Sequence, residues 1–196
     1  MPHIVVFDLE TRLMADELED GWEAMRRGEG GISALAVWDS EQRRTYLYDD
    51  HCVADCAAHL ESADLVVGFN SRSFDIPIVE GILGRKLRLK HHLDLLTTIW
   101  DALRRTGVKQ FKGNKLGDVA LRTIGRTKTG KGAAAPQLAK DGHWAKLFQY
   151  CMDDVDLTRA LFEHALETGT VVDVNGRELK LELPPWLKPK EVPNGD

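Results

Sequence analysis

The pattern of hydrophobic positions predicts strands mainly in the first half of the chain. Short apolar and β-branched runs occupy residues 3–9 (HIVVFDL), 32–39 (ISALAVWD) and 44–50 (RTYLYDD). Runs of this length and composition are typical of strands, and these three predict a meander. Residues 63–70 (ADLVVGFN) predict a further strand that runs into a turn. Residues 12–31 are acidic, then Gly-rich, and predict a long loop or a short helix.

Apolar positions at helical spacing dominate the second half. They predict helices within residues 52–62, 77–84, 93–107, 114–125 and 143–169, with Asn114 as the N-cap of the fourth. Asn175 and Gly176 stand between two alternating runs and predict a C-terminal hairpin. We therefore expect an α/β fold with a mixed central sheet flanked by helices. The expected boundaries are one domain over 1–183 and a proline-rich, disordered tail over 184–196.

Composition narrows the class of protein. The 196 residues are 43% hydrophobic and 29% charged, without an apolar run long enough to span a membrane, and the N-terminus lacks a secretory signal pattern. We expect a cytoplasmic protein. Cys52, Cys56 and Cys151 lack zinc-site spacing, and we interpret them as reduced, packed thiols.

The net charge of −5 hides one basic segment. Nine Lys or Arg residues and a single acid lie between Arg104 and Lys131, which gives this segment a net charge of +8. Such asymmetry favours contact with a phosphate backbone, although a solvated surface accounts equally well for any single lysine. The candidate contacts are Lys109, Lys112, Lys115, Arg126, Lys128 and Lys131.

Residues 125–132 (GRTKTGKG) nearly match the P-loop pattern GxxxxGK[ST]. The final hydroxyl residue is missing because Gly132 stands there, the preceding segment has a helical pattern, and the following AAAPQ does not predict a long helix. Nucleotide triphosphate binding is therefore the weaker interpretation.

Asp8 and Glu10 end the first strand and project to the same side of it, because strand side chains alternate. Two like charges about 4 Å apart repel by about 4 kcal/mol at an effective dielectric of ~20, and a divalent cation reverses that cost. Solvation at an exposed strand end is the alternative for this pair alone. Asp75 opens a predicted helix, where it also suits the helix dipole. Tyr150 and Asp154 share one helical face that is partly apolar, so a carboxylate there needs a partner.

Three motifs in this order resemble the DEDD 3'-to-5' exonucleases of the ribonuclease H-like fold, which are related to polymerase proofreading domains. The motifs are Asp8 to Thr11, Asn70 to Asp75, and Tyr150 to Asp154. Tyr150 lies four residues before Asp154 and residue 149 is Gln rather than His, so the sequence resembles the tyrosine subclass. Trp22, Asp94 and residues 114–125 extend the resemblance over roughly residues 3–168.

The resemblance implies a five-stranded sheet and a site for two divalent ions, Mg2+ or Mn2+. Asp8 would bridge both ions, Glu10 and Asp154 would complete one, and Asp75 would hold the other partly through water. Tyr150 would position the attacking water. Oxygen ligands suit Mg2+ or Mn2+ and speak against zinc.

The resemblance also implies contacts with the substrate. Thr11 would contact the 3' end, Leu13 or Met14 would wedge against the last base, and Asn70 and Phe74 would line the site. Plain packing for the apolar residues, and a simple turn role for Asn70, are the alternatives.

The expected activity is removal of nucleotides from DNA or RNA 3' ends, with single-stranded DNA favoured. A non-catalytic nucleic-acid-binding module and a structure-selective endonuclease are the alternatives. The sequence leaves open whether a helicase or polymerase delivers the substrate, and which oligomer forms.

Overall fold

A five-stranded mixed sheet organises the fold, and the computed structural model describes residues 2–109, 111–128 and 135–187. The strand order is β3-β2-β1-β4-β5, so β1 is central. β2 runs antiparallel to both β1 and β3, whereas β4 runs parallel to β1 and β5. The strands are β1 Ile4–Thr11, β2 Ile32–Asp39, β3 Arg44–Tyr48, β4 Leu65–Gly68 and β5 His92–Asp94. The predicted meander and the mixed five-stranded α/β fold are confirmed.

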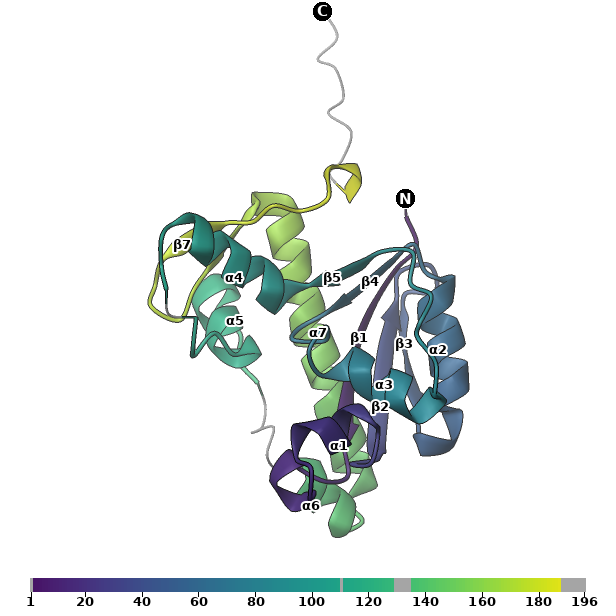
Figure 1. Cartoon of the computed structure of the whole chain (residues 1–196). Coiled ribbons are helices and arrows are strands. Elements are labelled where there is room, and N and C mark those ends of the chain that lie inside the picture. The colour runs from purple at the N-terminus through teal and green to yellow at the C-terminus, as the bar shows by residue number, and fades with distance from the viewer. Residues whose placement is uncertain (1, 110, 129–134, 188–196) are drawn as a thin grey trace, which may run out of the picture.

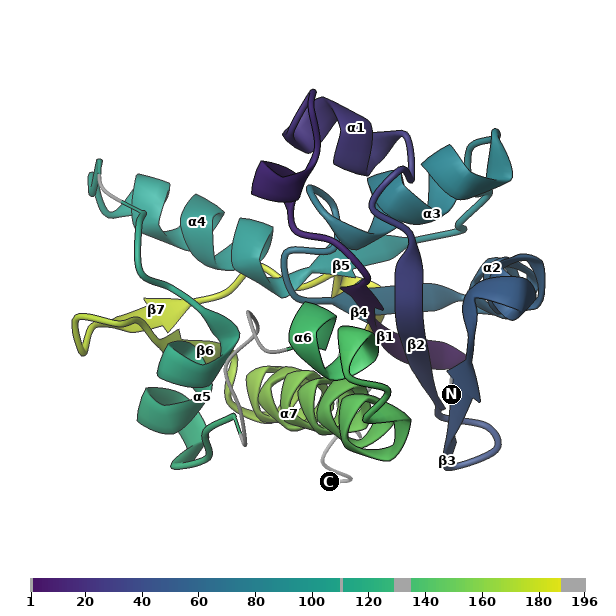
Figure 2. The ribbon, with the colours of Figure 1, turned by 90° about the horizontal axis from the view of Figure 1, so that it is seen from below.

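Helices cover both faces of this sheet. They are α1 Trp22–Arg26, α2 Val53–Ser62, α3 Asp75–Leu83, α4 Leu95–Arg105, α5 Leu116–Ile124, α6 Ala135–Lys140 and α7 Trp144–Thr168. Short 3-10 helices occupy Ala15–Glu17 (η1), Asp50–Cys52 (η2) and Pro185–Leu187 (η4). Figure 2 shows α1, α2 and α3 on one side of the sheet and α6 and α7 on the other.

The alternation of side chains along β1 divides the core in two. Val5, Phe7 and Leu9 are buried against α2 and α3, while Val6 is buried on the opposite face with residues of α4, α5 and α7. Strict alternation with a period of two produces this division, because neighbouring strand residues point to opposite faces. Asp8 and Glu10 follow Val6 in the alternation and so point to the α7 side.

Helix α7 is the long helix of Figure 1 and lies against β1 and β2. Its apolar residues recur at helical spacing, and Leu147, Cys151, Val155 and Leu161 are fully buried. Gly169 ends it with a left-handed backbone at φ 74°, which glycine adopts without steric cost.

The predicted C-terminal hairpin is present as β6 Thr170–Val172 and β7 Glu178–Lys180. It packs against α4, α5 and α7, and Val171, Leu179 and Leu181 are buried in the same core as α7. The Asp173 side chain accepts hydrogen bonds from the backbone N–H groups of Asn175 and Arg177, which fixes the turn. The hairpin is therefore part of the folded unit.

The sequence predicted Asn114 as the N-cap of α5, and this prediction is wrong. Lys115 takes that place, and the Asn114 side chain instead accepts a hydrogen bond from the Val174 N–H in the hairpin, at 3.0 Å. The prediction failed because the Asn114 side chain can either cap the helix or bond to a distant backbone group. Here the Val174 N–H takes its oxygen.

Two other element predictions need correction. The helix predicted over residues 93–107 begins at Leu95, because residues 92–94 pair with β4 as strand β5. In the predicted tail, Pro185–Leu187 forms η4, and Leu187 is buried in the core because its side chain packs against the α7 face of the fold. The remaining tail residues, 188–196, lie outside the described residues.

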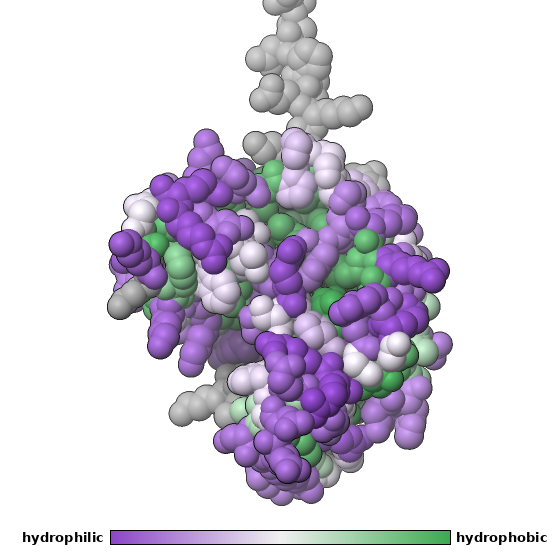
Figure 3. All heavy atoms as spheres, viewed as in Figure 1, coloured by the Kyte–Doolittle hydropathy of each residue, from purple (hydrophilic) through white to green (hydrophobic). Residues whose placement is uncertain are grey.

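Hydrophilic side chains cover most of the surface seen in Figure 3, and hydrophobic residues form small separate patches there. Within residues 2–109, 111–128 and 135–187, no helix has the length and apolar character required to cross a membrane.

Candidate metal centre

Strand β1 carries Asp8 and Glu10 to the centre of the α7 face. Their partners across the β1–β2 ladder are Ala36 and Ala34, whose methyl side chains leave space above the sheet. The register shifts between Glu10 and Thr11, where the chain begins to leave the sheet. A central strand thus presents two carboxylates at its C-terminal end, where ligands bind in many α/β sheets.

Helix α7 brings Asp154 and Tyr150 to the same place. They lie four residues apart and share one face of the helix, and both are buried. The thiol of Cys151, between them in sequence, donates to the main-chain oxygen of Asp8 at 3.5 Å. This contact joins α7 directly to β1 beside the carboxylates.

Asp75 reaches the site from the start of α3. Its Oδ1 accepts a hydrogen bond from the Leu9 N–H at 3.0 Å, and only 3% of the residue is exposed. The preceding turn is fixed by Asp94, whose carboxylate accepts from the N–H groups of Asn70 and Arg72, each at 2.9 Å. Asn70 adopts a left-handed backbone in that turn, at φ 65°.

One carboxylate oxygen from each of Asp8, Glu10 and Asp154 lies within 4.8 Å of the other two, close enough for all three to ligate one ion. Asp75 is not a member of this triad, but its charge is one of the causes that raise the pKa of Asp8. Four carboxylates from β1, α3 and α7 therefore converge.

Burial and mutual repulsion raise the pKa values of these acids. Burial is the largest cause for each, and it raises the pKa of Glu10 to about 8 and that of Asp75 to about 7. The pKa of Asp8 lies well above its ordinary value because burial is reinforced by the charges of Asp75, Asp154 and Glu10. The cluster resists full ionisation unless a cation enters it.

Lys128 supplies one positive charge at this point. Its Nζ donates to Asp154 Oδ2 at 2.5 Å and to the Tyr150 hydroxyl at 3.3 Å. Burial alone would lower the pKa of Lys128, but the charges of Asp154 and Asp8 outweigh it and raise that pKa. Lys128 is therefore a counter-ion within the acidic cluster, a position that its place in the basic segment did not predict.

The carboxylates form the floor of a pocket of about 230 Å3. Thr11, the last residue of β1, and Met14 after it line the pocket, and Phe69, Asn70 and Phe74 line it from the turn between β4 and α3. Phe74 is supported from behind by Trp22 of α1, with ring centroids 5.9 Å apart. The short helix α1 confirms one of the two structures predicted for residues 12–31, and its Trp22 braces a wall of the pocket.

The remaining predicted substrate contacts are not all in this pocket. Leu13 lies outside the lining that the described residues form, and its main-chain oxygen accepts from the Thr11 hydroxyl at 2.8 Å. Lys112 and Lys115 are exposed near the start of α5 and also lie outside the lining. Lys131 lies outside the described residues. The near P-loop begins after helix α5, as predicted, and continues beyond the described residues after Lys128.

Sequence reasoning missed three residues of the site. Cys151 was interpreted only as a packed thiol, Phe69 only as part of a turn, and Pro136 lies on α6, which was not predicted. Pro136 belongs to a helix of six residues, too short for a periodic signal.

These residues fit divalent metal ions. The donor atoms of the four acids are all carboxylate oxygens, which Mg2+ and Mn2+ favour, and the cluster already contains a cation, Lys128, at hydrogen-bonding distance. Asp8, Glu10 and Asp154 would hold an ion, and Asp75, at the start of α3, would add a further carboxylate oxygen.

Comparison with solved structures supports the fold. The family B DNA polymerase from the hyperthermophilic archaeon Pyrobaculum calidifontis matches with a TM-score of 0.63 and 18% sequence identity. The match covers 85% of this chain and 25% of the polymerase, so the chain spans about a quarter of that protein. No family model and no curated protein sequence matches the chain.

The raised pKa values predict how metal and pH affect stability together. In metal-free protein, Glu10 and Asp75 bind protons more tightly when folded than when unfolded, so their contribution to folding falls as pH rises from about 5 to about 8. Metal binding requires the ionised form and removes the repulsion. The rise in unfolding temperature caused by millimolar Mg2+ should therefore increase over this pH range. Thermal unfolding with Mg2+ or EDTA measures it, and a rise independent of pH would contradict the assignment.

Lys128→Met tests the counter-ion directly. In EDTA, its unfolding temperature should fall below that of wild type, because Asp154 loses its cation. Saturating Mg2+ should narrow this difference, since the metal supplies the missing charge. Lys115→Met, at an exposed position outside the pocket, is the control and should match wild type in both buffers. A Lys128→Met deficit that is identical with and without Mg2+ would contradict this role.

Proposed function

We propose that the chain is a metal-dependent 3'-to-5' exonuclease of the tyrosine subclass, acting on nucleic-acid 3' ends with single-stranded DNA favoured. The observation that carries the proposal is the convergence of Asp8, Glu10 and Asp154 within ligand distance of one another, with Tyr150 beside them. The likeness to a DNA polymerase fold supports a nucleic-acid substrate.

Two bound divalent ions would activate a water and stabilise the charge that develops on the phosphate and the leaving oxygen. The chain's own residues would prepare that chemistry. Asp75 has one oxygen committed to the Leu9 N–H, which leaves the other for ligation or for a bound water. Asp8 is attached to α7 through Cys151, so the two ligand-bearing elements keep their spacing.

Tyr150 would orient the attacking water through its hydroxyl. Burial raises the pKa of this phenol, so it stays protonated and acts as a hydrogen-bond donor and acceptor rather than as a base. Lys128 already donates to this hydroxyl. With the charge of Asp154 compensated by a bound ion, the Lys128 ammonium would be able to contact a substrate phosphate.

The walls of the pocket suit a terminal nucleotide. Phe69, Phe74 and Met14 offer apolar surface for a base and sugar, while the carboxylate floor and Lys128 lie where a phosphate and its metal ions would sit. Thr11 also lines the pocket and would contact the 3' end.

Digestion of 5'-labelled single-stranded DNA and of the matching RNA, with Mg2+ or Mn2+, tests the proposal. Wild type should give a ladder that shortens from the 3' end. Asp154→Asn should slow cleavage at least ~100-fold, because a metal ligand contributes several kcal/mol to transition-state stabilisation. Tyr150→Phe should slow it by about 100-fold through loss of water positioning.

Asp153→Asn is the matched control. Asp153 is the neighbour of Asp154 on α7, but it accepts a hydrogen bond from the Gln149 amide at 2.7 Å and does not line the pocket. This variant should cleave at nearly the wild-type rate. Internal cuts would favour a structure-selective endonuclease, and metal-independent binding without cleavage would favour a non-catalytic nucleic-acid-binding module. Equal loss in Asp153→Asn and Asp154→Asn would contradict the assigned ligand.

A further inference from the structure

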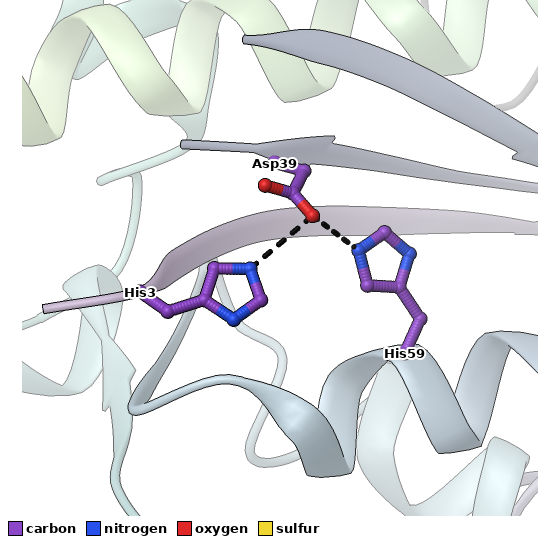
Figure 4. Close-up of side chains that lie close together, drawn as sticks. All are labelled: His3, Asp39 and His59. Carbon is purple, nitrogen blue, oxygen red and sulfur yellow. Dashed lines mark hydrogen bonds and ion pairs between the residues drawn. The ribbon is translucent and has the colours of Figure 1, made fainter. Parts of the chain in front are cut away.

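A second group of side chains of metal-ligating types lies at the opposite end of β1. His3 precedes β1, Asp39 ends the neighbouring strand β2, and His59 projects from α2. Figure 4 shows the two imidazoles pointing at one carboxylate oxygen from either side. Their Nε2 atoms lie 3.2 Å (His3) and 2.9 Å (His59) from Asp39 Oδ2.

The spacing suits a small ion with tetrahedral ligands. Zn2+ binds imidazole nitrogen and carboxylate oxygen at about 2.0–2.2 Å, which places neighbouring ligand atoms roughly 3.3 Å apart. Both His–Asp separations lie close to that value, and ligand atoms of all three residues can lie within 4.8 Å of one another. The site therefore needs little rearrangement to close around an ion.

The carboxylate is already oriented for ligation. Asp39 Oδ1 accepts hydrogen bonds from the Glu41 and Gln42 N–H groups at 2.7 and 2.9 Å. These bonds fix the carboxylate plane and leave Oδ2 directed at the two histidines. The Asp39 side chain is only 6% exposed and each histidine side chain 13% exposed, so the three ligands are mostly buried but remain reachable by a water molecule.

The histidines differ in their partners. His59 Nδ1 lies 2.8 Å from the Tyr48 hydroxyl, and a hydrogen bond to the second ring nitrogen is the arrangement that orients most metal-binding histidines. His3 Nε2 is buried and makes no hydrogen bond of acceptable geometry within the described part of the chain, despite its closeness to Asp39. A buried nitrogen without a hydrogen bond is costly unless something else engages it.

We propose that His3, Asp39 and His59 bind one Zn2+ ion, with water as the fourth ligand. Two imidazoles and one carboxylate favour a borderline transition metal over Mg2+, in contrast to the all-oxygen cluster at the other end of β1. The ion would join the start of β1 to β2 and α2, and this structural role is independent of the proposed exonuclease activity. Without metal, the same groups form a hydrogen-bonded chain from Tyr48 through His59 to Asp39.

Calorimetric titration of untagged, full-length protein with Zn2+ tests the proposal, in buffer containing millimolar Mg2+ to occupy the carboxylate cluster. Wild type should bind Zn2+ at the histidine site, and that Zn2+ should raise the unfolding temperature by an amount that grows with the logarithm of the free Zn2+ concentration above the dissociation constant. His59→Gln and Asp39→Asn should each weaken this binding at least ~10-fold, because each removes a ligand. Asp39→Asn keeps an Oδ1 acceptor for the Glu41 and Gln42 N–H groups.

His51→Gln is the matched control. His51 lies in η2, directly before α2, but its side chain is 88% exposed and is not part of the cluster. Its Zn2+ binding should equal that of wild type. His3→Gln removes a ligand atom, Nε2, that makes no hydrogen bond of acceptable geometry with the described residues, and unfolding in EDTA verifies that each variant folds.

Zn2+ binding that is absent in wild type, or that is unchanged in His3→Gln and His59→Gln, would overturn the proposal. Asp8→Asn separates the two sites: it should leave the histidine-dependent Zn2+ binding intact whether or not the chain cleaves nucleic acid. Loss of that binding in Asp8→Asn would also count against a separate site.

Discussion

Repulsion among the carboxylates of Asp8, Glu10, Asp75 and Asp154 is the constraint on which the rest of the site depends. They are brought together by elements that are fixed for other reasons: β1 is the central strand, α7 packs on it through apolar residues, and α3 starts where the β4 turn ends. Burial makes the repulsion expensive and raises the pKa values of the acids. Full ionisation of the cluster therefore requires positive charge, which Lys128 supplies in part and a divalent metal would supply fully.

Much of this arrangement could be predicted from the sequence, because it depends on local periodicity. Alternation along residues 4–10 predicts that Asp8 and Glu10 share a face, and helical spacing predicts the same for Tyr150 and Asp154. The failures involve tertiary contacts. Strand β5 has three residues and is defined by its pairing with β4, and Asn114 bonds to the distant hairpin. Lys128 reaches the cluster because the loop after α5 carries it there. The basic segment contains several lysines, and nothing in the sequence distinguishes the one that enters the site.

The two ends of β1 present opposite donor chemistries. Its C-terminal end carries only carboxylates and faces an open pocket, which suits hard ions that must exchange substrate and water. Its N-terminal end joins two histidines and one aspartate that are largely shielded from solvent. His3, Asp39 and His59 are widely separated in sequence and follow no motif spacing, so their convergence appears only in the folded chain. One strand thereby connects a candidate catalytic centre with a candidate structural one.

Crystallography of the protein with Mn2+, using anomalous scattering to locate the ion, would show whether the carboxylate cluster is a metal centre. We expect an anomalous peak among Asp8, Glu10 and Asp154, with the Lys128 ammonium displaced from its contact with Asp154. An empty carboxylate cluster at saturating Mn2+, with Lys128 still bound to Asp154, would show that the lysine alone neutralises these acids and would contradict a metal centre.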